Sequence, residues 1–204
     1  MADAAEHWDP IYASKPSTEL SWYVGEPAVS LRLVEGMAVS PSVAVIDVGA
    51  GASLLVDRLL ADDFTDITVL DVSRHALAEV EERLGAGARH VTFIRHDVLT
   101  WQSDRQYDVW HDRAVFHFLT DDARRDRYVE TAARAIRAGG GLVLATFAED
   151  GPTQCSGLPV SRYSAGDLET VFSGLFSLVE HEREVHRTPG GVDQSFTWTV
   201  LRRA

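Results

Sequence analysis

Residues 43–53 read Val-Ala-Val-Ile-Asp-Val-Gly-Ala-Gly-Ala-Ser, an apolar run that ends in a glycine-rich turn. The run from Val43 to Gly49 predicts a buried strand, and the apolar i,i+4 spacing within residues 53–61 predicts a helix directly after it. Gly49 and Gly51 have no side chain, so they permit a tight turn and let a ligand approach the backbone. In an open parallel sheet, such a ligand binds at the carboxyl ends of the strands.

The rest of the chain repeats this alternation of short apolar runs and helical patterns, which is typical of a parallel sheet with crossover helices. The expected strands span residues 43–49, 67–72, 91–94, 107–110, 142–147, 176–185 and 195–201. The expected helices span residues 26–39, 53–61, 73–84, 120–137 and 167–172, and the glycines at 139–141 are expected to end the fourth of them. The loop 188–191, Thr-Pro-Gly-Gly, suits an antiparallel hairpin. We therefore predict an α/β fold with a seven-stranded Rossmann-like sheet, mostly parallel with an antiparallel C-terminal strand, and helices on both faces.

Composition excludes several kinds of site and partner. The 204 residues contain 19 Lys+Arg against 31 Asp+Glu, a net charge of −12, so the chain should bind neither nucleic acid nor anionic membranes. Its single cysteine excludes a disulfide framework and a four-cysteine zinc site. No apolar run is long enough to span a membrane and the N-terminus lacks the apolar core of a signal peptide, so we expect a cytoplasmic protein.

An acidic residue stands where a nucleoside cofactor would need one. Asp71 ends the second expected strand, 20 residues after Gly51, where a carboxylate can accept both hydroxyl groups of a ribose. A dinucleotide fingerprint would also need glycine at position 54, which is Leu54 here. The Gly-x-Gly-x-Gly pattern that is typical of methyltransferases has Ser53 in place of its third glycine, which is the smaller departure.

Several segments together resemble the class I S-adenosylmethionine-dependent methyltransferases, in particular their small, single-domain bacterial type. In chain order these segments are VIDVGAGAS (45–53), VLDVS (69–73), HDV (96–98), YDVWHDR (107–113), RAGGGLVLATF (137–147) and the terminal strand pair. The resemblance implies S-adenosyl-L-methionine as cofactor, with its ribose bound by Asp71 and its adenine by Asp97 and Val98. It also implies cofactor contacts from Asp47, Gly49, Ala50, Gly51, Ser53, Val72 and His111.

The first 40 residues differ in character from the rest of the chain. We predict that residues 1–40 form a helical and aromatic cover, and that residues 41–204 form the cofactor-binding core of a single domain. The cover contains Trp8, Tyr12, Trp22 and Tyr23. These aromatic side chains either plug the open end of the sheet or form a lid over the occupied site, and one segment can do both.

Polar side chains crowd the segment that follows the fourth expected strand. His111, Asp112, Arg113 and His117 lie within seven residues, at the edge of the sheet that faces the methyl group in this fold. We expect His111 to line the pocket, Asp112 or Arg113 to orient the substrate, and His117 to act as a base slightly in preference to His111. The alternative is that Asp112 and Arg113 form an ion pair that braces the loop, while His117 is a packed residue.

The loop at residues 151–163, after the fifth expected strand, should fold over the same edge. Cys155 in this loop and His186 beside the last hairpin are candidate substrate contacts, although a lone cysteine is more often a small buried residue. The chain has no His-Glu-x-x-His or similar ligand spacing, so we expect no metal.

The sequence therefore predicts methyl transfer from S-adenosyl-L-methionine to a small molecule, with the accepting N, O or S atom left open. The alternative is a protein-lysine methyltransferase, because residues 7–12, His-Trp-Asp-Pro-Ile-Tyr, resemble the start of some thiol and some protein-lysine methyltransferases. An NAD(P)-dependent oxidoreductase is disfavoured by Leu54 and because the only lysine, Lys15, precludes a Tyr-x-x-x-Lys catalytic pair. A non-catalytic nucleotide-binding module remains a further alternative.

Overall fold

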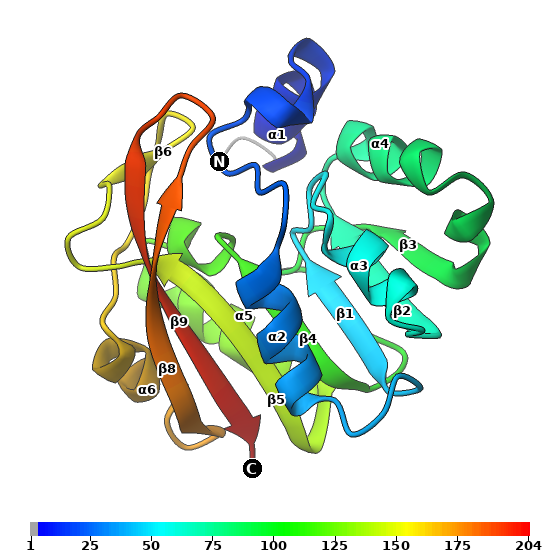
Figure 1. Ribbon diagram of the computed structural model, residues 1–204. Helices are drawn as coiled ribbons and strands as arrows, with labels where there is room; N and C mark the ends of the chain where they lie inside the picture. Colours follow the sequence, from blue (N-terminus) through cyan, green and yellow to red (C-terminus); the bar gives the residue numbers. More distant parts are fainter. Residues whose placement is uncertain (1–3) are drawn as a thin grey trace.

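The computed structural model describes residues 4–204 and contains a seven-stranded sheet in the order β3-β2-β1-β4-β5-β9-β8 (Figure 1). Its strands are β1 (Ala44–Val48), β2 (Asp66–Asp71), β3 (Val91–Arg95), β4 (Tyr107–Arg113), β5 (Ile136–Phe147), β8 (Phe176–Arg187) and β9 (Asp193–Arg203). Strands β1 to β5 pair in parallel, whereas β9 pairs antiparallel with both β5 and β8. The predicted seven-stranded sheet with an antiparallel C-terminal strand is confirmed.

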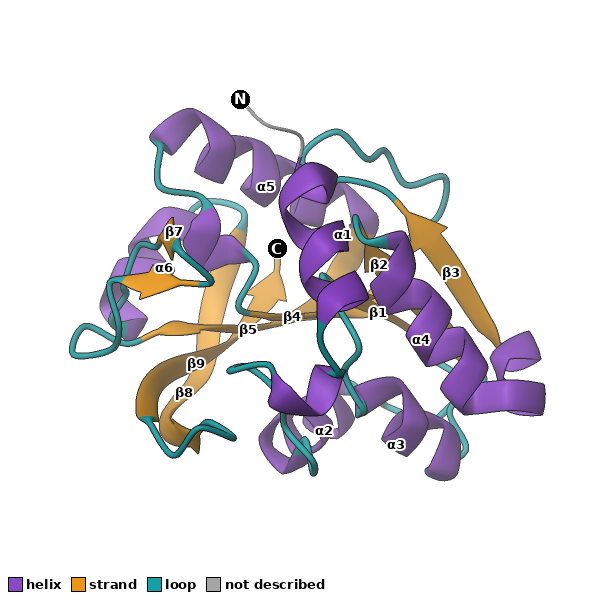
Figure 2. Cartoon of the chain, turned by 90° about the horizontal axis from the view of Figure 1, so that it is seen from above, coloured by secondary structure: helices purple, strands orange, loops and turns teal. Residues whose placement is uncertain are grey.

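Helices cover both faces of the sheet, as Figure 2 shows for the layers on either side of it. The helices are α1 (Ala4–Ser14), α2 (Ala28–Met37), α3 (Leu55–Ala61), α4 (Arg74–Leu84), α5 (Asp122–Ala135) and α6 (Ala165–Phe172). Apolar side chains of α2, α3 and α4 pack on one face, and those of α5 and α6 pack on the other. No helix within residues 4–204 is long and apolar enough to cross a membrane.

The central strand β1 shows why this sheet forms here. Each of its five residues is buried, and their side chains alternate between the two cores, with Val45 in one and Ile46 in the other. Full burial of such a side chain stabilises the fold by about 1.5–3 kcal/mol. A parallel strand that is buried on both faces needs an unbroken apolar run, and the sequence supplies one until Asp47.

Two predicted boundaries were wrong near the site. β4 continues to Arg113, so the polar segment 111–113 belongs to a strand and not to the loop after it. β5 already begins at Ile136, so the three glycines at 139–141 lie inside a strand and do not end a helix. Gly141 is required there because a Cβ atom would lie 2.5 Å from the Cε of Met37, where α2 crosses the sheet.

The remaining elements of the chain were not predicted from the sequence. Residues 4–14 form α1 even though Pro10 lies inside it. The expected loop at residues 151–163 contains a small hairpin of β6 (Gln154–Cys155) and β7 (Leu158–Pro159). Short 3-10 turns span Ser17–Glu19, Gly85–His90 and Phe116–Phe118.

Candidate active site

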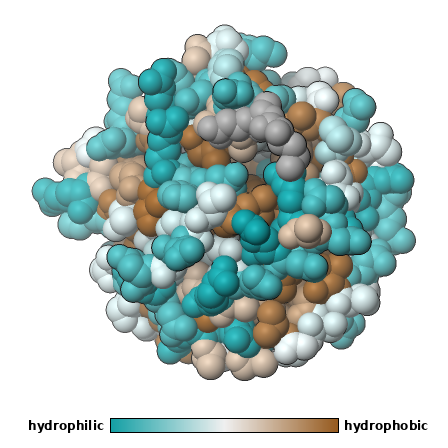
Figure 3. Space-filling model, turned by 180° about the vertical axis from the view of Figure 1, so that it is seen from behind, coloured by the Kyte–Doolittle hydropathy of each residue, from teal (hydrophilic) through white to brown (hydrophobic). Residues whose placement is uncertain are grey.

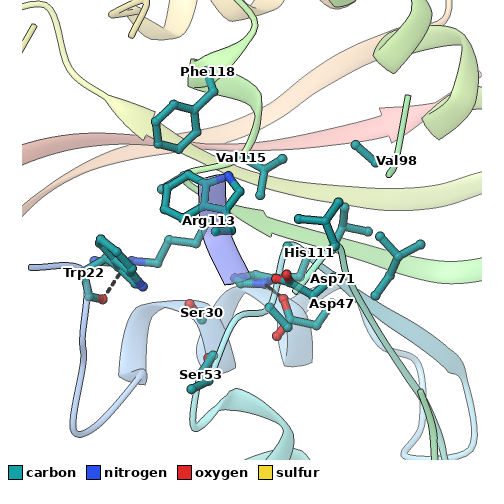
Figure 4. Close-up of a pocket in the computed structure, with 18 of the residues that line it drawn as sticks. Trp22, Ser30, Asp47, Ser53, Asp71, Val98, His111, Arg113, Val115 and Phe118 are labelled. Atoms are coloured by element: carbon teal, nitrogen blue, oxygen red, sulfur yellow. Dashed lines mark hydrogen bonds and ion pairs between the residues drawn. The ribbon is translucent and has the colours of Figure 1, made fainter. Parts of the chain in front are cut away.

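A cavity of about 180 Å³ lies at the carboxyl ends of β1, β2 and β4, beneath α1 and the segment that follows it (Figure 4). Nine of the ten predicted cofactor contacts line this cavity, namely Asp47, Gly49, Ala50, Ser53, Asp71, Val72, Asp97, Val98 and His111. The tenth, Gly51, lies behind the hydroxyl group of Tyr12. The topology therefore brings together residues that are separated by up to 64 positions in the sequence.

The turn after β1 requires glycine at two positions. Gly49 has a φ of +61° and Gly51 a φ of +56°, in the left-handed region that side chains disfavour. A Cβ atom on Gly49 would lie 1.9 Å from the Cγ2 of Val115, and one on Gly51 would lie 2.1 Å from the hydroxyl oxygen of Tyr12. Both glycines are thus needed for the conformation of the turn and for the close approach of its neighbours.

Asp71 holds the turn and faces the cavity. Its Oδ2 accepts a hydrogen bond from the backbone N–H of Gly51 at 2.8 Å, and its Oδ1 accepts one from Ser73 at 2.7 Å. Burial raises the pKa of Asp71 to about 6, although these two hydrogen bonds act in the opposite direction. Each carboxylate oxygen can accept a second hydrogen bond, so this side chain can still bind hydroxyl groups in the cavity.

Asp47 and His111 form a buried pair on neighbouring strands. They stand opposite each other in the β1–β4 register, and Nδ1 of His111 lies 2.7 Å from Oδ1 of Asp47. Within the described part of the chain, Oδ2 of Asp47 and Nε2 of His111 have no hydrogen-bond partner, although both atoms are buried. An unpaired buried carboxylate oxygen is costly, so a donor from a ligand would satisfy Asp47.

At the far end of the cavity, the turn after β3 presents Asp97 and Val98. Val98 is buried, and Oδ1 of Asp97 accepts a hydrogen bond from the backbone N–H of Leu99 at 2.9 Å. Asp97 therefore orders its own turn and keeps its other carboxylate oxygen for a ligand. This end of the cavity would fit a flat apolar group that packs against Val98 and donates a hydrogen bond to the carboxylate of Asp97.

The four aromatic residues of the cover all line the cavity. The indole N–H of Trp22 donates to the hydroxyl oxygen of Tyr12 at 3.1 Å, and the ring centroids of Trp8 and Trp22 lie 5.6 Å apart. Tyr23 completes the set. Trp8, Tyr12 and Trp22 thus form a connected aromatic group in the wall of the cavity, and residues 1–3 of the predicted cover lie outside the described residues.

A comparison with protein families identifies the kind of domain that contains this cavity. Residues 46–142, from β1 into β5, match the model of a methyltransferase domain. These residues are a methyltransferase domain. One solved methyltransferase of this fold, the N-methyltransferase NodS of Bradyrhizobium japonicum, is in complex with S-adenosylhomocysteine.

Curated relatives of this methyltransferase are distant. The eEF1A lysine and N-terminal methyltransferase of Mus musculus is 23% identical over 155 residues, which are 72% of this chain and 22% of that protein. The EEF1A lysine methyltransferase 2 of Danio rerio is 23% identical over 156 residues, or 69% of this chain and 66% of that protein. The chain thus spans about a fifth of the mouse relative's length.

Solved structures match the methyltransferase over almost its whole length. One, described as the conversion of a disulfide bond into a thioacetal group during echinomycin biosynthesis, has a TM-score of 0.79 at 19% identity and covers 98% of this chain and 93% of that one. A methyltransferase from Anabaena variabilis has a TM-score of 0.74 at 17% identity, with 100% and 96% covered. The 1,6-didemethyltoxoflavin-N1-methyltransferase of Burkholderia thailandensis has 0.70 at 18%, with 95% and 81% covered. At these identities, the matches establish a shared fold.

Alternation along β4 separates the polar residues that the sequence grouped together. Arg113 points to the cavity, whereas Asp112 is fully buried on the opposite face of the methyltransferase sheet. Asp112 accepts hydrogen bonds from the backbone N–H groups of Val115 and Phe116, at 2.8 and 3.2 Å, and from the hydroxyl group of Tyr128. The expectation that Asp112 contacts the substrate was wrong, and so was its alternative of an Asp112–Arg113 ion pair.

His117 does not reach the cavity either. Its ring is fully buried between Phe118 and Phe147, with centroids 4.5 and 4.6 Å away. Its Nδ1 accepts a hydrogen bond from the backbone N–H of Phe147 at 3.4 Å. Burial, aided by the charge of Arg113, lowers the pKa of His117 to about 3. The preference for His117 as the catalytic base was therefore wrong, and the residue is part of the core.

We expect His117→Ala to lower stability without changing the pH dependence of methyl transfer. Loss of a buried ring should cost about 2–3 kcal/mol of unfolding free energy. Thermal unfolding and the pH profile of turnover, measured for the wild type and the variant, check this result. A variant that unfolds normally but loses turnover at neutral pH would restore His117 as a base.

The two remaining candidates take different places. Cys155 lines the cavity, and burial raises the pKa of its thiol to about 11, so it is protonated at neutral pH. His186 does not line the cavity, because its Nε2 lies 2.8 Å from the backbone oxygen of Ser21 and holds the cover. The expectation that His186 reaches the substrate was wrong. Residues 4–204 contain no cluster of His, Cys, Asp and Glu that could hold a metal ion.

The sequence analysis missed many of the residues that line the cavity, among them two polar residues and one aromatic residue. Ser30 on α2, Glu184 on β8 and Trp198 on β9 all line the cavity. The indole N–H of Trp198 donates to Oε2 of Glu184 at 2.7 Å. Each of these three residues belongs to a helix or strand that was predicted. The sequence did not indicate which face of that helix or strand lies at the cavity.

Proposed function

We propose that this protein transfers a methyl group from S-adenosyl-L-methionine to a small molecule. The observation that carries the proposal is that the chain's own aromatic cover forms one wall of the cavity. Hydrogen bonds from Arg113 of β4 and His186 of β8 to backbone oxygens of the cover connect it to the sheet. Trp8 packs on Trp22 and on Phe118, with ring centroids 5.6 and 5.2 Å apart. A cavity walled by aromatic side chains of the same chain suits a small acceptor that fits inside it.

We further propose which cavity residues bind each part of the cofactor. Asp97 and Val98 take the adenine, Asp71 takes the ribose hydroxyl groups, and the unpaired Oδ2 of Asp47 accepts from the ammonium group of the methionine part. His111 holds Asp47 in place. When bound, the cofactor supplies an activated methyl group, and the protein contributes alignment and exclusion of water.

This division leaves the opposite end of the cavity for the acceptor. Trp22, Arg113 and Phe118 lie there in Figure 4, away from Val98. We propose that residues 1–40 are the cover and residues 41–204 the cofactor-binding core of one domain. The outer face seen in Figure 3 is largely hydrophilic, with apolar residues in separate groups, and offers no broad apolar surface for a protein partner.

The alternative is a protein substrate, which the names of the mouse and zebrafish relatives favour. The two alternatives separate in one experiment. The purified chain is incubated with S-adenosylmethionine and either a panel of small thiols, phenols and amines or recombinant eEF1A, and formation of S-adenosylhomocysteine is measured by mass spectrometry. We expect product with members of the small-molecule panel above the rate without acceptor. Methylated eEF1A and no turnover of the panel would contradict the proposal.

Cofactor affinity should depend on pH through Asp71. Because the pKa of this carboxyl group is about 6, it is ionised at pH 7 and mostly protonated at pH 5, where it accepts hydrogen bonds less well. We expect the affinity for S-adenosylhomocysteine to fall about tenfold between pH 7 and pH 5, as calorimetry would measure. Asp71→Asn should bind more weakly at pH 7 and show a flat profile. An equal fall in both proteins would assign the effect to another group.

A further inference from the structure

The helix α1 is the least embedded of the α-helices. None of its residues 4–14 is fully buried, whereas α2 buries Ser30, Leu33 and Val34, and each of the other α-helices also has buried residues. Even so, Trp8 and Tyr12 of α1 form part of the cavity wall. A helix with so little buried surface is of the kind that detaches from a fold at low free energy.

Tyr12 connects α1 with the proposed ribose site. Its hydroxyl oxygen lies against Gly51, whose backbone N–H group donates to Asp71 at 2.8 Å. Loss of water around the hydroxyl group and the nearby charge of Asp71 both raise the pKa of Tyr12. Asp71 itself is only 6% exposed. The carboxylate that would bind the ribose is therefore covered while α1 is in place.

One carboxylate of α1 fastens this helix to the start of α4, and Figure 2 shows the two helices side by side. Oδ1 of Asp9 accepts a hydrogen bond from the hydroxyl group of Ser73 at 2.7 Å and lies 3.5 Å from the backbone nitrogen of His75. Its Oδ2 lies 3.7 Å from Nε of Arg74 and 3.6 Å from Nη2 of Arg95. We call Asp9 with Ser73, Arg74 and Arg95 the latch.

The latch carries a charge at neutral pH. Burial acts to raise the pKa of Asp9, but its hydrogen bonds and the charge of Arg95 lower the pKa below the ordinary value of a carboxyl group. An ionised carboxylate at the first turn of α4 is also favoured by the dipole of that helix. The contact between α1 and α4 is thus a charge-assisted one, which is stronger than a neutral hydrogen bond.

Ser73 belongs both to the latch and to the proposed ribose site. Its backbone N–H group donates to Oδ1 of Asp71 at 2.7 Å, and its hydroxyl group donates to Asp9. Asp9 does not line the cavity, so it can influence a ligand only through α1 and Ser73. For the same reason, the latch can form whether the site is empty or filled.

We propose that α1 is a gate to the cofactor site and that the latch at Asp9 sets how often this gate opens. The proposal rests on the proposed function, which places the cofactor ribose at Asp71. The cofactor enters and leaves while α1 is detached, and docking of α1 returns Trp8 and Tyr12 to the cavity wall. Because the latch holds α1 equally in the empty and the filled protein, it controls both rates and leaves the affinity nearly unchanged. Asp9 is thus a positioning residue.

The test measures the binding kinetics of S-adenosylhomocysteine with the full chain by stopped-flow fluorescence, because Trp8 and Trp22 line the cavity. Asp9→Ala should raise both the association and the dissociation rate constant about tenfold, since it removes a charged acceptor. Their ratio, Kd, should change by less than about twofold. Asp9→Asn keeps an acceptor for Ser73 and loses only the charge, so both rate constants should rise by a smaller factor of about threefold.

A control and a second measurement separate the gate from a general loss of structure. Glu6 is an exposed carboxylate on the same helix, so Glu6→Ala should change neither rate constant. In hydrogen–deuterium exchange of the full chain without ligand, residues 4–14 should exchange about tenfold faster in Asp9→Ala, while α2 exchanges as in the wild type.

Two results would overturn the gate. One is a higher Kd of Asp9→Ala with an unchanged association rate constant, because the latch would then only support the filled site. The other is unchanged exchange of residues 4–14 in this variant. A wild-type chain that binds no S-adenosylhomocysteine would instead overturn the proposed function, and the exchange measurement would still decide whether the latch holds α1.

Discussion

Asp71→Ala should lower the affinity for S-adenosylhomocysteine about 100-fold. The proposed ribose contact uses two charge-assisted hydrogen bonds, each worth about 1.5–3 kcal/mol, and the substitution removes both acceptors. It also frees the backbone N–H groups of Gly51 and Ser73, which hold the glycine turn and the start of α4. We therefore expect a lower melting temperature of the cofactor-free protein as well. Calorimetric titration and thermal unfolding measure the two effects.

A matched variant lies at the other end of the same strand. Asp66 pairs with Arg105 on the surface and is remote from the cavity. Asp66→Ala should leave the affinity for S-adenosylhomocysteine unchanged. If Asp71→Ala lost stability but bound the product as tightly as the wild type, the carboxylate would serve only to hold the turn, and the ribose assignment would be wrong.

The sequence was sufficient where local pattern and chemistry agree. The run before Gly49 is both an apolar strand and the entry to a turn with positive φ, and Ser73 is an N-cap whose hydroxyl oxygen accepts from the backbone N–H of Ala76. These features depend on residues close together in the chain, so the strands, the turn and the position of Asp71 could be inferred without coordinates.

The sequence was insufficient where buried polar residues find partners far away. The segment 111–113 looks like a loop because it is polar, yet it continues a strand. Nδ1 of His111 pairs with Asp47, and Asp112 accepts a hydrogen bond from Tyr128, both on other elements. Once the strand is known to continue, its two-residue period places Arg113 on the cavity side and Asp112 opposite. The two-residue alternation could be predicted from the sequence, but the end of β4 at Arg113 could not.

The prediction for the glycines at 139–141 was wrong because a distant contact decides their place, and a distant contact also holds a proline inside α1. Glycine usually weakens a strand, but here Gly141 makes room for Met37 of α2, a contact across more than 100 residues. Proline is unfavourable inside a helix, yet Pro10 lies within α1, where Trp8 and Tyr12 of the same helix pack over the site. Tertiary contacts overrode local preference in both places.

Asp112→Ala should destabilise the fold by about 3 kcal/mol or more. The substitution leaves the hydroxyl group of Tyr128 and the backbone N–H groups of Val115 and Phe116 without their acceptor in a fully buried place, and each such group costs about 1–3 kcal/mol. For a chain of this length, that corresponds to a fall in melting temperature of roughly 10 °C. Differential scanning calorimetry measures it directly.

A control on the same region separates this role from general sensitivity of the neighbouring helix. Asp122 lies in the first turn of α5 and is 89% exposed, so Asp122→Ala should change the melting temperature little. At a temperature where Asp112→Ala remains folded, its affinity for S-adenosylhomocysteine should match the wild type, because the lost carboxylate faces away from the cavity. Normal stability together with lost turnover would place Asp112 in the chemistry and would contradict its assignment to the turn after β4.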